Sequence, residues 1–332
     1  MPPLASPTII GRWKAGLLLG LGLAVLVYVG YALHIGAAEV AGALASFHWR
    51  WLPLLLVLSL INYGLRFVRW ELFLHRLEVR VPRRTSAAVF LAGLAMTLTP
   101  GKVGEFLKSY LLKESVGVPM ARTAPVVFAE RLSDLLALVL LACLGVARYG
   151  GPRAAPLLGL AGGGLLAGIF VLQSERVTAR VLSLLGRIRP LRGLLGKLAE
   201  ALGAARALLH PTPLFLGVLL SSLAWWAECL EYLYVFRGFG ITTVEHGVAV
   251  FGYAFSTLAG VISPGGLGPT DIGLVEIARR ATPALQGRDD VAAAAAFIVR
   301  VCTLWFAVGL GALALLRFRK LVAVEVDAAR GE

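Results

Sequence analysis

The chain has 332 residues, of which 58% are hydrophobic and 15% are charged, and its mean hydropathy is +0.80. Soluble domains carry about 45–50% apolar and about 25% charged residues, so this composition excludes a water-soluble fold and indicates a polytopic membrane protein. The formal net charge of +13 does not indicate a nucleic-acid partner. The basic residues lie in the gaps between apolar segments, and the aromatic residues lie within or beside those segments instead of alternating with the basic ones.

The first half of the chain begins with apolar segments of about 20 residues, the length that crosses a bilayer as a helix. Residues 15–35 form the first, which we interpret as a retained helix because no small-residue cleavage site follows it closely. Residues 51–74 form the second. Residues 85–98 are too short to cross and end at a Pro-Gly pair, and the segment 104–113 continues beyond it.

Two further spans are expected at 120–147 and 155–173, before a segment of a different kind at 174–210. In that segment, basic residues recur mostly three to seven positions apart among apolar ones, which is typical of an amphipathic helix on an anionic membrane surface. Its basic residues are Arg176, Arg180, Arg187, Arg189, Arg192, Lys197 and Arg206.

The second half repeats the order of segments in the first. A span at 213–237 is followed by an apolar segment, 246–262, that ends at a second Pro-Gly pair. The segment 270–282 continues beyond that pair, and the last span covers 290–316.

The two Pro-Gly breaks share one pattern: a hydroxyl residue, Pro, Gly, two residues, Gly, and an acid one or three positions later. They occupy residues 99–105 and 263–271, about 164 residues apart. Paired breaks in corresponding halves of a membrane protein indicate a substrate site at a repeat interface. Each break also begins a new helix, whose free amides and positive dipole end could hold a phosphate oxygen.

The charge distribution predicts the topology if each broken segment enters and leaves the membrane on one side. With a cytoplasmic N-terminus, about 21 of the 32 Lys and Arg residues then lie inside and about 7 outside, as the positive-inside rule requires. The C-terminus is then also cytoplasmic. Residues 174–210 become a basic cytoplasmic segment.

This topology makes the chain an all-α polytopic integral membrane protein in a single transmembrane domain, 1–332. The first repeat covers 51–147 with a re-entrant hairpin at 85–113, and the second covers 213–316 with a re-entrant hairpin at 246–282. The hairpins open to opposite sides, so the repeats have inverted topology, an arrangement that suits alternating access.

Charged residues inside the spans are costly in a bilayer and are therefore expected to be paired or functional. Arg66 and Arg69 share one helix face, as do Glu130 and Asp134, so we expect ion pairs between these two spans. In the second half, Glu228 and Glu231 share a face, and Arg300 is the cation deep in the last span. These acids could bind a headgroup, relay protons together with Asp271, or only lock helices together.

No motif indicates a metal, a cofactor or catalysis. Cys143, Cys229 and Cys302 all lie in apolar segments at no metal-binding spacing, and the histidines are scattered. Walker, His-Glu-x-x-His and nucleophile-elbow sequences are missing. We therefore expect that the protein is not an enzyme.

Taken together, the motifs resemble those of the lysylphosphatidylglycerol synthase transmembrane family. The residues that carry the resemblance are the run 99–112, the sequence Glu-Arg-Leu-Ser-Asp at 130–134, and Pro-Gly-Gly-Leu-Gly at 264–268 with Asp271. Members are often described as flippase-like. The best-known relatives move an aminoacylated phosphatidylglycerol between leaflets beside a soluble synthase domain, and others are linked to polyprenyl-phosphate-linked sugars or hopanoids. The chain ends at Glu332 without such a domain, so we do not expect synthase activity.

The resemblance and the breaks together favour a lipid translocase in a bacterial-type inner membrane. Its substrate would be an anionic or aminoacylated phospholipid or a polyprenyl-phosphate-type lipid, and its partner a second copy or a separate lipid-modifying synthase. One alternative is a membrane transferase using Glu105, Glu130 and Asp134, and another is a non-catalytic subunit that docks through 174–210. The residues expected to bind the substrate are Arg66, Arg69, Pro100, Gly101, Gly104, Glu105, Lys108, Glu130, Arg131, Asp134, Glu228, Glu231, Pro264, Gly265, Gly266, Gly268, Asp271 and Arg300.

Overall fold

A computed structural model describes residues 22, 25–26, 29–30, 36–187 and 193–328, and every regular element among them is a helix. The expected first span, 15–35, lies almost wholly outside the described residues. The helices of the first half are α2 (Ala37–Ser46), η1 (Trp49–Trp51), α3 (Leu52–Arg76), α4 (Arg83–Leu94), η2 (Ala95–Leu98), η3 (Pro100–Phe106), α5 (Leu107–Val116), α6 (Met120–Cys143), α7 (Val146–Tyr149) and α8 (Gly151–Gln173).

The helices of the second half begin with a pair that covers the expected basic segment. They are α9 (Glu175–Gly186), α10 (Leu195–Leu209), α11 (Pro211–Gly238), α12 (His246–Ala259), η5 (Pro264–Gly266), α13 (Pro269–Ala281), η6 (Pro283–Leu285), α14 (Asp289–Arg300), the π-helical turn η7 (Val301–Trp305) and α15 (Phe306–Ala328). In the part of the chain that the structure describes, four helices are long and apolar enough to cross a membrane: Trp49–Arg76, Gly151–Gln173, Pro211–Gly238 and Asp289–Phe318.

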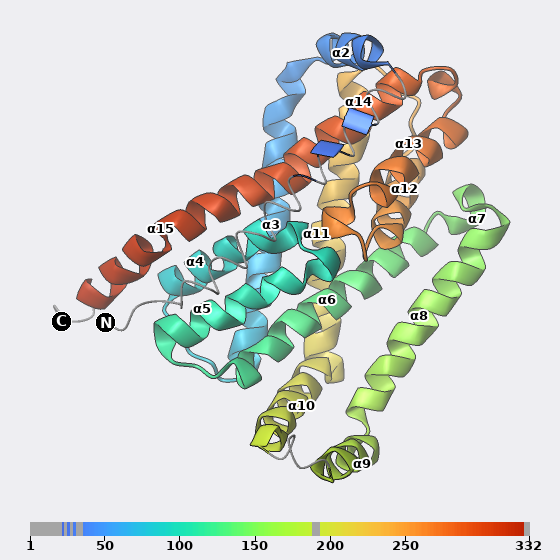
Figure 1. Ribbon diagram of the computed structural model, residues 1–332. Helices are drawn as coiled ribbons and strands as arrows, with labels where there is room; N and C mark the ends of the chain where they lie inside the picture. The colour runs from blue at the N-terminus through green and yellow to red at the C-terminus, as the bar shows by residue number, and fades with distance from the viewer. Residues whose placement is uncertain (1–21, 23–24, 27–28, 31–35, 188–192, 329–332) are drawn as a thin grey trace.

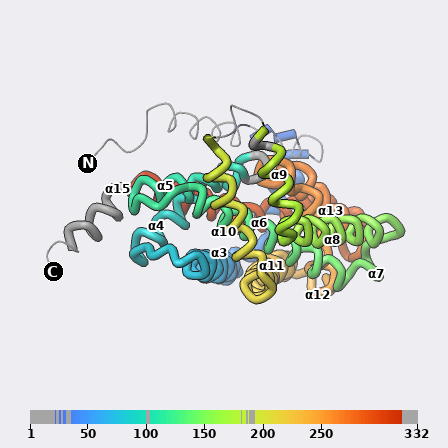
Figure 2. The backbone as a smooth tube through the Cα atoms, turned by 90° about the horizontal axis from the view of Figure 1, so that it is seen from below, coloured from blue at the N-terminus to red at the C-terminus, as the bar shows by residue number. Residues whose placement is uncertain are grey.

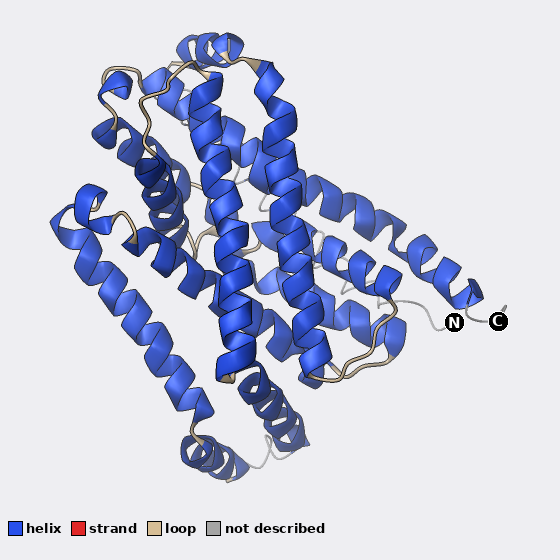
Figure 3. Ribbon diagram, turned by 180° about the vertical axis from the view of Figure 1, so that it is seen from behind, coloured by secondary structure: helices blue, strands red, loops and turns tan. Residues whose placement is uncertain are grey.

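Helices α3 and α11 pack against each other on one face of the molecule and run antiparallel. Ser59 contacts Glu231, Asn62 donates to the Ala224 carbonyl, and Arg69 donates to Ser221, so the α11 partner moves backward as α3 advances. Figure 3 shows the two helices side by side along the length of the bundle. Most of their buried side chains are apolar, and three of the polar ones on α3, Ser59, Asn62 and Arg69, form hydrogen bonds across this contact.

Both Pro-Gly breaks lie at the tips of helical hairpins. Helices α4 and α5 pack together and join through the first break, and α12 and α13 do the same through the second. In Figure 1 the two hairpins lie on opposite sides of α11. Their tips meet, because η3 contacts η5, and Leu98 packs in one small apolar cluster with Leu267 and Leu304.

Glycine allows this close contact at the second break. Gly265 has φ +58°, and a Cβ there would lie 3.0 Å from Leu98 Cδ2. Backbone of this kind is tolerated within a membrane only where protein or a polar cavity covers it. Each break therefore covers the other.

The basic segment 174–210 differs from the single amphipathic stretch that its charge pattern predicts. It forms two helices, α9 and α10, and the sequence places Pro190 and Gly193 between them. Ala204, Ala205, Leu208 and Leu209 bury the apolar face of α10 in the bundle. Figure 2, which views this end of the molecule, shows α9 and α10 lying across it.

The last helix approaches the first hairpin at a glycine. A Cβ on Gly311 of α15 would lie 2.2 Å from the backbone nitrogen of Ala95, whereas one on Gly309 would meet nothing within 4 Å. Small residues at such crossings allow helices to pack closely in membranes.

The substitution Gly311→Ala should therefore force α15 away from η2 and destabilise the protein by about 1–3 kcal/mol, the usual cost of overpacking. The matched change Gly309→Ala should not lower the free energy of unfolding, since alanine favours helix and nothing lies near its Cβ position. Thermal unfolding in detergent would compare them. Equal stability of the two variants would contradict the close packing of α15 on η2.

Candidate functional site

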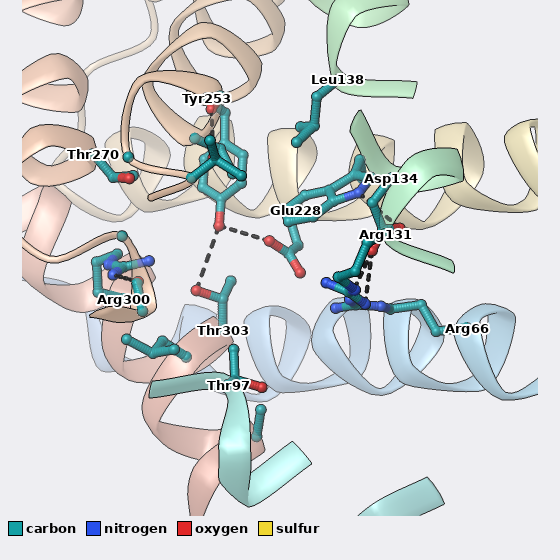
Figure 4. Close-up of a pocket in the computed structure, with 18 of the residues that line it drawn as sticks. Arg66, Thr97, Arg131, Asp134, Leu138, Glu228, Tyr253, Thr270, Arg300 and Thr303 are labelled. Atoms are coloured by element: carbon teal, nitrogen blue, oxygen red, sulfur yellow. Dashed lines mark hydrogen bonds and ion pairs between the residues drawn. The ribbon is translucent and has the colours of Figure 1, made fainter. Parts of the chain in front are cut away.

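A cavity of about 290 Å³ lies beside the second break, between the two halves of the helix bundle. It is lined by α3, the end of α4, η2, α6, α11, α12, the second break, the start of α13 and the α14–α15 helix. Figure 4 shows charged side chains pointing into it from two sides. Its polar lining residues are Tyr63, Arg66, Thr97, Arg131, Asp134, Trp225, Glu228, Tyr253, Thr257, Thr270, Arg300 and Thr303.

Asp134 is the centre of an ion-pair network on one side of the cavity. Its carboxylate lies 2.5 Å from Arg69 Nη1, 2.9 Å from Arg131 Nη2 and 3.1 Å from Arg66 Nη2. The expected pairing between the spans that became α3 and α6 is thus confirmed. Helical spacing produces it, because residues three or four apart point to the same side.

The network continues away from the cavity to the first break. Arg131 Nη2 also lies 3.1 Å from Glu105 Oε2, and Lys108 pairs with Glu130. Arg69 Nη2 lies 3.7 Å from Glu130 Oε1. The network contains the four cations Arg66, Arg69, Lys108 and Arg131 and the three carboxylates of Glu105, Glu130 and Asp134.

This network has one more cation than carboxylate. Its side chains are almost completely buried, and the most exposed is Arg131, at 19%, which lines the cavity. Glu228, another cavity residue, also acts on Arg66, so a fourth negative charge balances the network from the cavity lining. Arg66 and Arg131 are the two cations of the network that line the cavity and that a ligand there could reach.

Arg300 provides a second cation at the opposite side. Its Nε lies 3.1 Å from Asp271 Oδ1, and its Nη2 donates to the carbonyl oxygen of Gly265 in the second break. This pair crosses from α14 to the start of α13. It fixes the break against the last membrane helix.

Two backbone amides of the breaks, where phosphate binding was expected, donate to side chains of the protein. The Gly104 N–H donates to Thr99 Oγ1 at 2.8 Å, and the Gly268 N–H donates to Asp271 Oδ2 at 2.9 Å. Both breaks thus satisfy one of their own amides with a nearby oxygen. The side chains of Arg66, Arg131 and Arg300, and not these two amides, present positive charge to the cavity.

The remaining acids occupy different positions. Glu228 lines the cavity and accepts a hydrogen bond from the Tyr253 hydroxyl at 2.7 Å, and that hydroxyl lies 3.4 Å from Thr303 Oγ1. Figure 4 shows this chain of contacts between the two groups of cations. Glu231 lies one turn further along α11, outside the cavity and fully buried beside Ser59.

The residues expected to bind substrate therefore divide into two groups. Those that line the cavity are Arg66, Arg131, Asp134, Glu228, Gly265, Gly266 and Arg300. Those that lie around it, in the network, at the breaks or in the helix contacts, are Arg69, Pro100, Gly101, Gly104, Glu105, Lys108, Glu130, Glu231, Pro264, Gly268 and Asp271.

Sequence reasoning missed the aromatic and hydroxyl residues of the cavity. Tyr63 precedes Arg66 by three positions, Trp225 precedes Glu228 by three, and Thr303 follows Arg300 by three. Residues three positions apart lie on the same helix face, so each of these side chains lies on the face of a charged residue that the sequence had already indicated. That rule would have found them. Trp225 also lies under the Arg66 guanidinium, 5.6 Å from ring centroid to Cζ.

The described residues contain no candidate metal centre. No group of three or more His, Cys, Asp or Glu side chains there is arranged to hold an ion. The three acids that a transferase would need, Glu105, Glu130 and Asp134, are each paired with Arg or Lys.

Comparison with known proteins gives a family and two distant relatives. Residues 15–311 match the family described as the lysylphosphatidylglycerol synthase TM region. Two proteins of Methanothermobacter thermautotrophicus, each named a UPF0104 membrane protein, are 25% and 23% identical to the chain. The first alignment covers 94% of this chain and 98% of the relative, and the second covers 88% and 90%. No solved structure matches the chain.

The buried network predicts a large loss of stability when one of its cations is removed. The change Arg69→Met should destabilise the protein by about 3–5 kcal/mol, because Asp134 and Glu130 each lose a buried partner. Arg148 pairs with Glu245 at the surface, 70% exposed, and Arg148→Met should cost about 1 kcal/mol or less. Thermal unfolding in detergent measures both. A loss for Arg69→Met no larger than for Arg148→Met would mean that the network does not stabilise the fold.

Proposed function

We propose a function from two premises: the chain belongs to the lysylphosphatidylglycerol synthase transmembrane family, and a charged cavity lies between the two halves of its helix bundle. The chain is a multi-pass membrane protein in which several apolar helices surround that cavity. The proposed activity is translocation of a lipid with an anionic headgroup between the two leaflets. The observation that carries the proposal is that three arginine side chains, those of Arg66, Arg131 and Arg300, line one cavity.

The cavity suits a phosphate group. Arg66 and Arg131 reach it from one side and Arg300 from the other. Arginine binds phosphate oxygens through paired N–H donors, and such charge-assisted bonds are strong where the dielectric is low. Glu228 and Asp134 add negative charge to the same lining, so a headgroup that also carries an amine would find a partner. Phospholipids, aminoacylated phospholipids and polyprenyl phosphates are all compatible with this lining.

The cavity wall also contains the apolar surface that a lipid tail needs. Ile262 lines the cavity beside the second break and is 81% exposed on the molecular surface. Val103, in the first break, is also exposed. A lipid could therefore place its headgroup among the arginines while its tails remain in the bilayer. The tails then stay in an apolar environment in either leaflet, so no apolar surface is exposed to water during the movement.

The arrangement of helices supports alternating access between two inverted repeats. In this proposal, α3 to α6 form one repeat and α11 to α15 the other, with α4–α5 and α12–α13 as re-entrant hairpins from opposite sides. The antiparallel contact of α3 with α11 supports it, because corresponding helices of inverted repeats run in opposite directions. Both termini would lie in the cytoplasm, at a bacterial-type inner membrane.

This proposal assigns no catalytic residue, and a second copy of the chain or a separate lipid-modifying enzyme would be its protein partner. No sequence motif for ATP binding supports transport driven by ATP hydrolysis. The energy would come from a lipid or ion gradient.

Transport in reconstituted vesicles tests the proposal directly. The full chain should move fluorescent phosphatidylglycerol, or a polyprenyl phosphate, across the bilayer faster than protein-free vesicles do. Arg131→Gln should reduce that rate about tenfold or more, since loss of one charge-assisted contact of about 1.5–3 kcal/mol changes binding by at least that factor. Arg131→Lys should retain part of it.

The matched control is Arg280→Gln, which removes a surface arginine whose side chain is 77% exposed. It should leave the rate unchanged, and unfolding curves should show that each variant is folded. The proposal fails if no lipid class moves faster than in protein-free vesicles, or if a folded Arg131→Gln protein transports at the wild-type rate.

A further inference from the structure

Glu231 is a buried acid that the cavity does not use. It lies in α11, one turn after Glu228, and its side chain has no exposed surface. Within residues 36–187 and 193–328, no basic side chain forms an ion pair with it, whereas Asp134, Glu105 and Glu130 all have Arg or Lys partners. Its hydrogen-bond partner is the hydroxyl of Ser59 on α3. An ionised carboxylate in such a place is costly unless a cation compensates it.

The contacts of Ser59 reveal where a proton must be. Ser59 Oγ lies 2.8 Å from the carbonyl oxygen of Cys302, and 3.0 and 3.2 Å from the two carboxyl oxygens of Glu231. A hydroxyl has one hydrogen to donate, and a backbone carbonyl can only accept. The shortest contact is the one to Cys302, so the hydroxyl hydrogen belongs there. The contact with Glu231 is then a hydrogen bond only if the carboxyl group itself carries a proton and donates it to Ser59.

The carbonyl that Ser59 holds belongs to the π-helical turn η7. Tyr63, one turn along α3, donates to the next carbonyl, that of Thr303, at 2.6 Å. Two hydroxyl groups of α3 thus hold consecutive carbonyl groups of η7. Single π-turns within α-helices occur frequently at functional sites. This turn lies between Arg300, which holds the second break, and α15, which packs on η2 before the first break.

Several titratable groups face Glu231 from the elements packed around it. On its own helix, Glu228 is the nearest acid and repels a second negative charge. The others are Tyr63 from α3, Tyr253 from α12 and Cys302 from η7. Arg66 acts on Tyr63 and Arg300 acts on Tyr253, and these two arginines pair with Asp134 and Asp271.

We propose that Glu231 is a proton-binding site and that its proton couples lipid movement to a proton gradient. With the proton present, Glu231 donates to Ser59, and Ser59 donates to the Cys302 carbonyl, so η7 is tied to α3. On release, the proton passes to Glu228, which lines the cavity, and from there to solvent. Ser59 then turns its hydrogen to the new carboxylate, so η7 loses the hydrogen bond from Ser59 and keeps the one from Tyr63. The coupling rests on the proposed function, whereas proton binding does not.

Infrared spectroscopy of the full chain in lipid nanodiscs tests the proton site without any transport. The wild type at neutral pH should show a carbonyl band of a protonated carboxylic acid. Glu231→Gln should remove that band, and its amide still donates to Ser59, so the variant should fold. Ser59→Ala should shift the band, since the acid loses its acceptor. The surface variant Glu276→Gln should leave it unchanged.

The proton site is disproved if the wild type has no such band, or if the band is the same in Glu231→Gln. An unshifted band in Ser59→Ala would likewise place the proton elsewhere.

Vesicles with a transmembrane pH difference test the coupling. The gradient should change the wild-type rate of phosphatidylglycerol movement about fivefold or more, the low end of usual coupling between sites. The Glu231→Gln rate should not respond to the gradient. If both proteins respond equally, or neither responds, coupling through Glu231 is wrong. If the wild type moves no lipid at all, the proposed function fails, and the infrared result still decides the proton site.

Discussion

The structure depends on one buried carboxylate, that of Asp134, which forms ion pairs with three arginines from two helices. The protein interior penalises each of these charges, so Arg66, Arg69 and Arg131 can be buried only if they are compensated. Asp134 fixes α3 against α6, and Arg131 extends the network to Glu105 at the first break. The positions of both α3 and the first hairpin thus follow from charge compensation.

The second constraint is the irregular backbone at the two Pro-Gly breaks. A chain that interrupts its helices within a membrane must cover the freed polar groups. Here Thr99 accepts a hydrogen bond from the Gly104 amide and Asp271 from the Gly268 amide, and Arg300 donates to the Gly265 carbonyl. Leu98, beside the first break, packs against Leu267 of the second. The cavity is the space that remains beside this contact, and it is lined by both halves of the chain.

Much of this could be predicted from the sequence, because hydrophobic length and helical spacing are local properties. The ends of α3, α11 and both hairpins agree with the predicted segments within a few residues, and the family resemblance is confirmed. The pairing of Arg66 and Arg69 with Asp134 followed from spacing on two helix faces. The inversion of the repeats and the re-entrant nature of the hairpins stay proposals, since they concern the position of the membrane.

Other features depended on contacts between distant segments, and the sequence did not indicate them. Lys108 pairs with Glu130 and Arg300 with Asp271, choices that only the packing of α5 on α6 and of α13 on α14 decides. The π-turn at 301–305 has no Pro or Gly to mark it. The amides of Gly104 and Gly268 were expected to be available for phosphate, but side chains a few residues away accept from them.

The most direct test of the central claim is an electron cryomicroscopy map of the full chain in nanodiscs that contain phosphatidylglycerol. The account predicts a lipid headgroup in the cavity, with its phosphate within hydrogen-bond distance of Arg131 or Arg300, and both Pro-Gly breaks near the middle of the bilayer. A cavity without lipid, together with breaks at the bilayer surface, would contradict it.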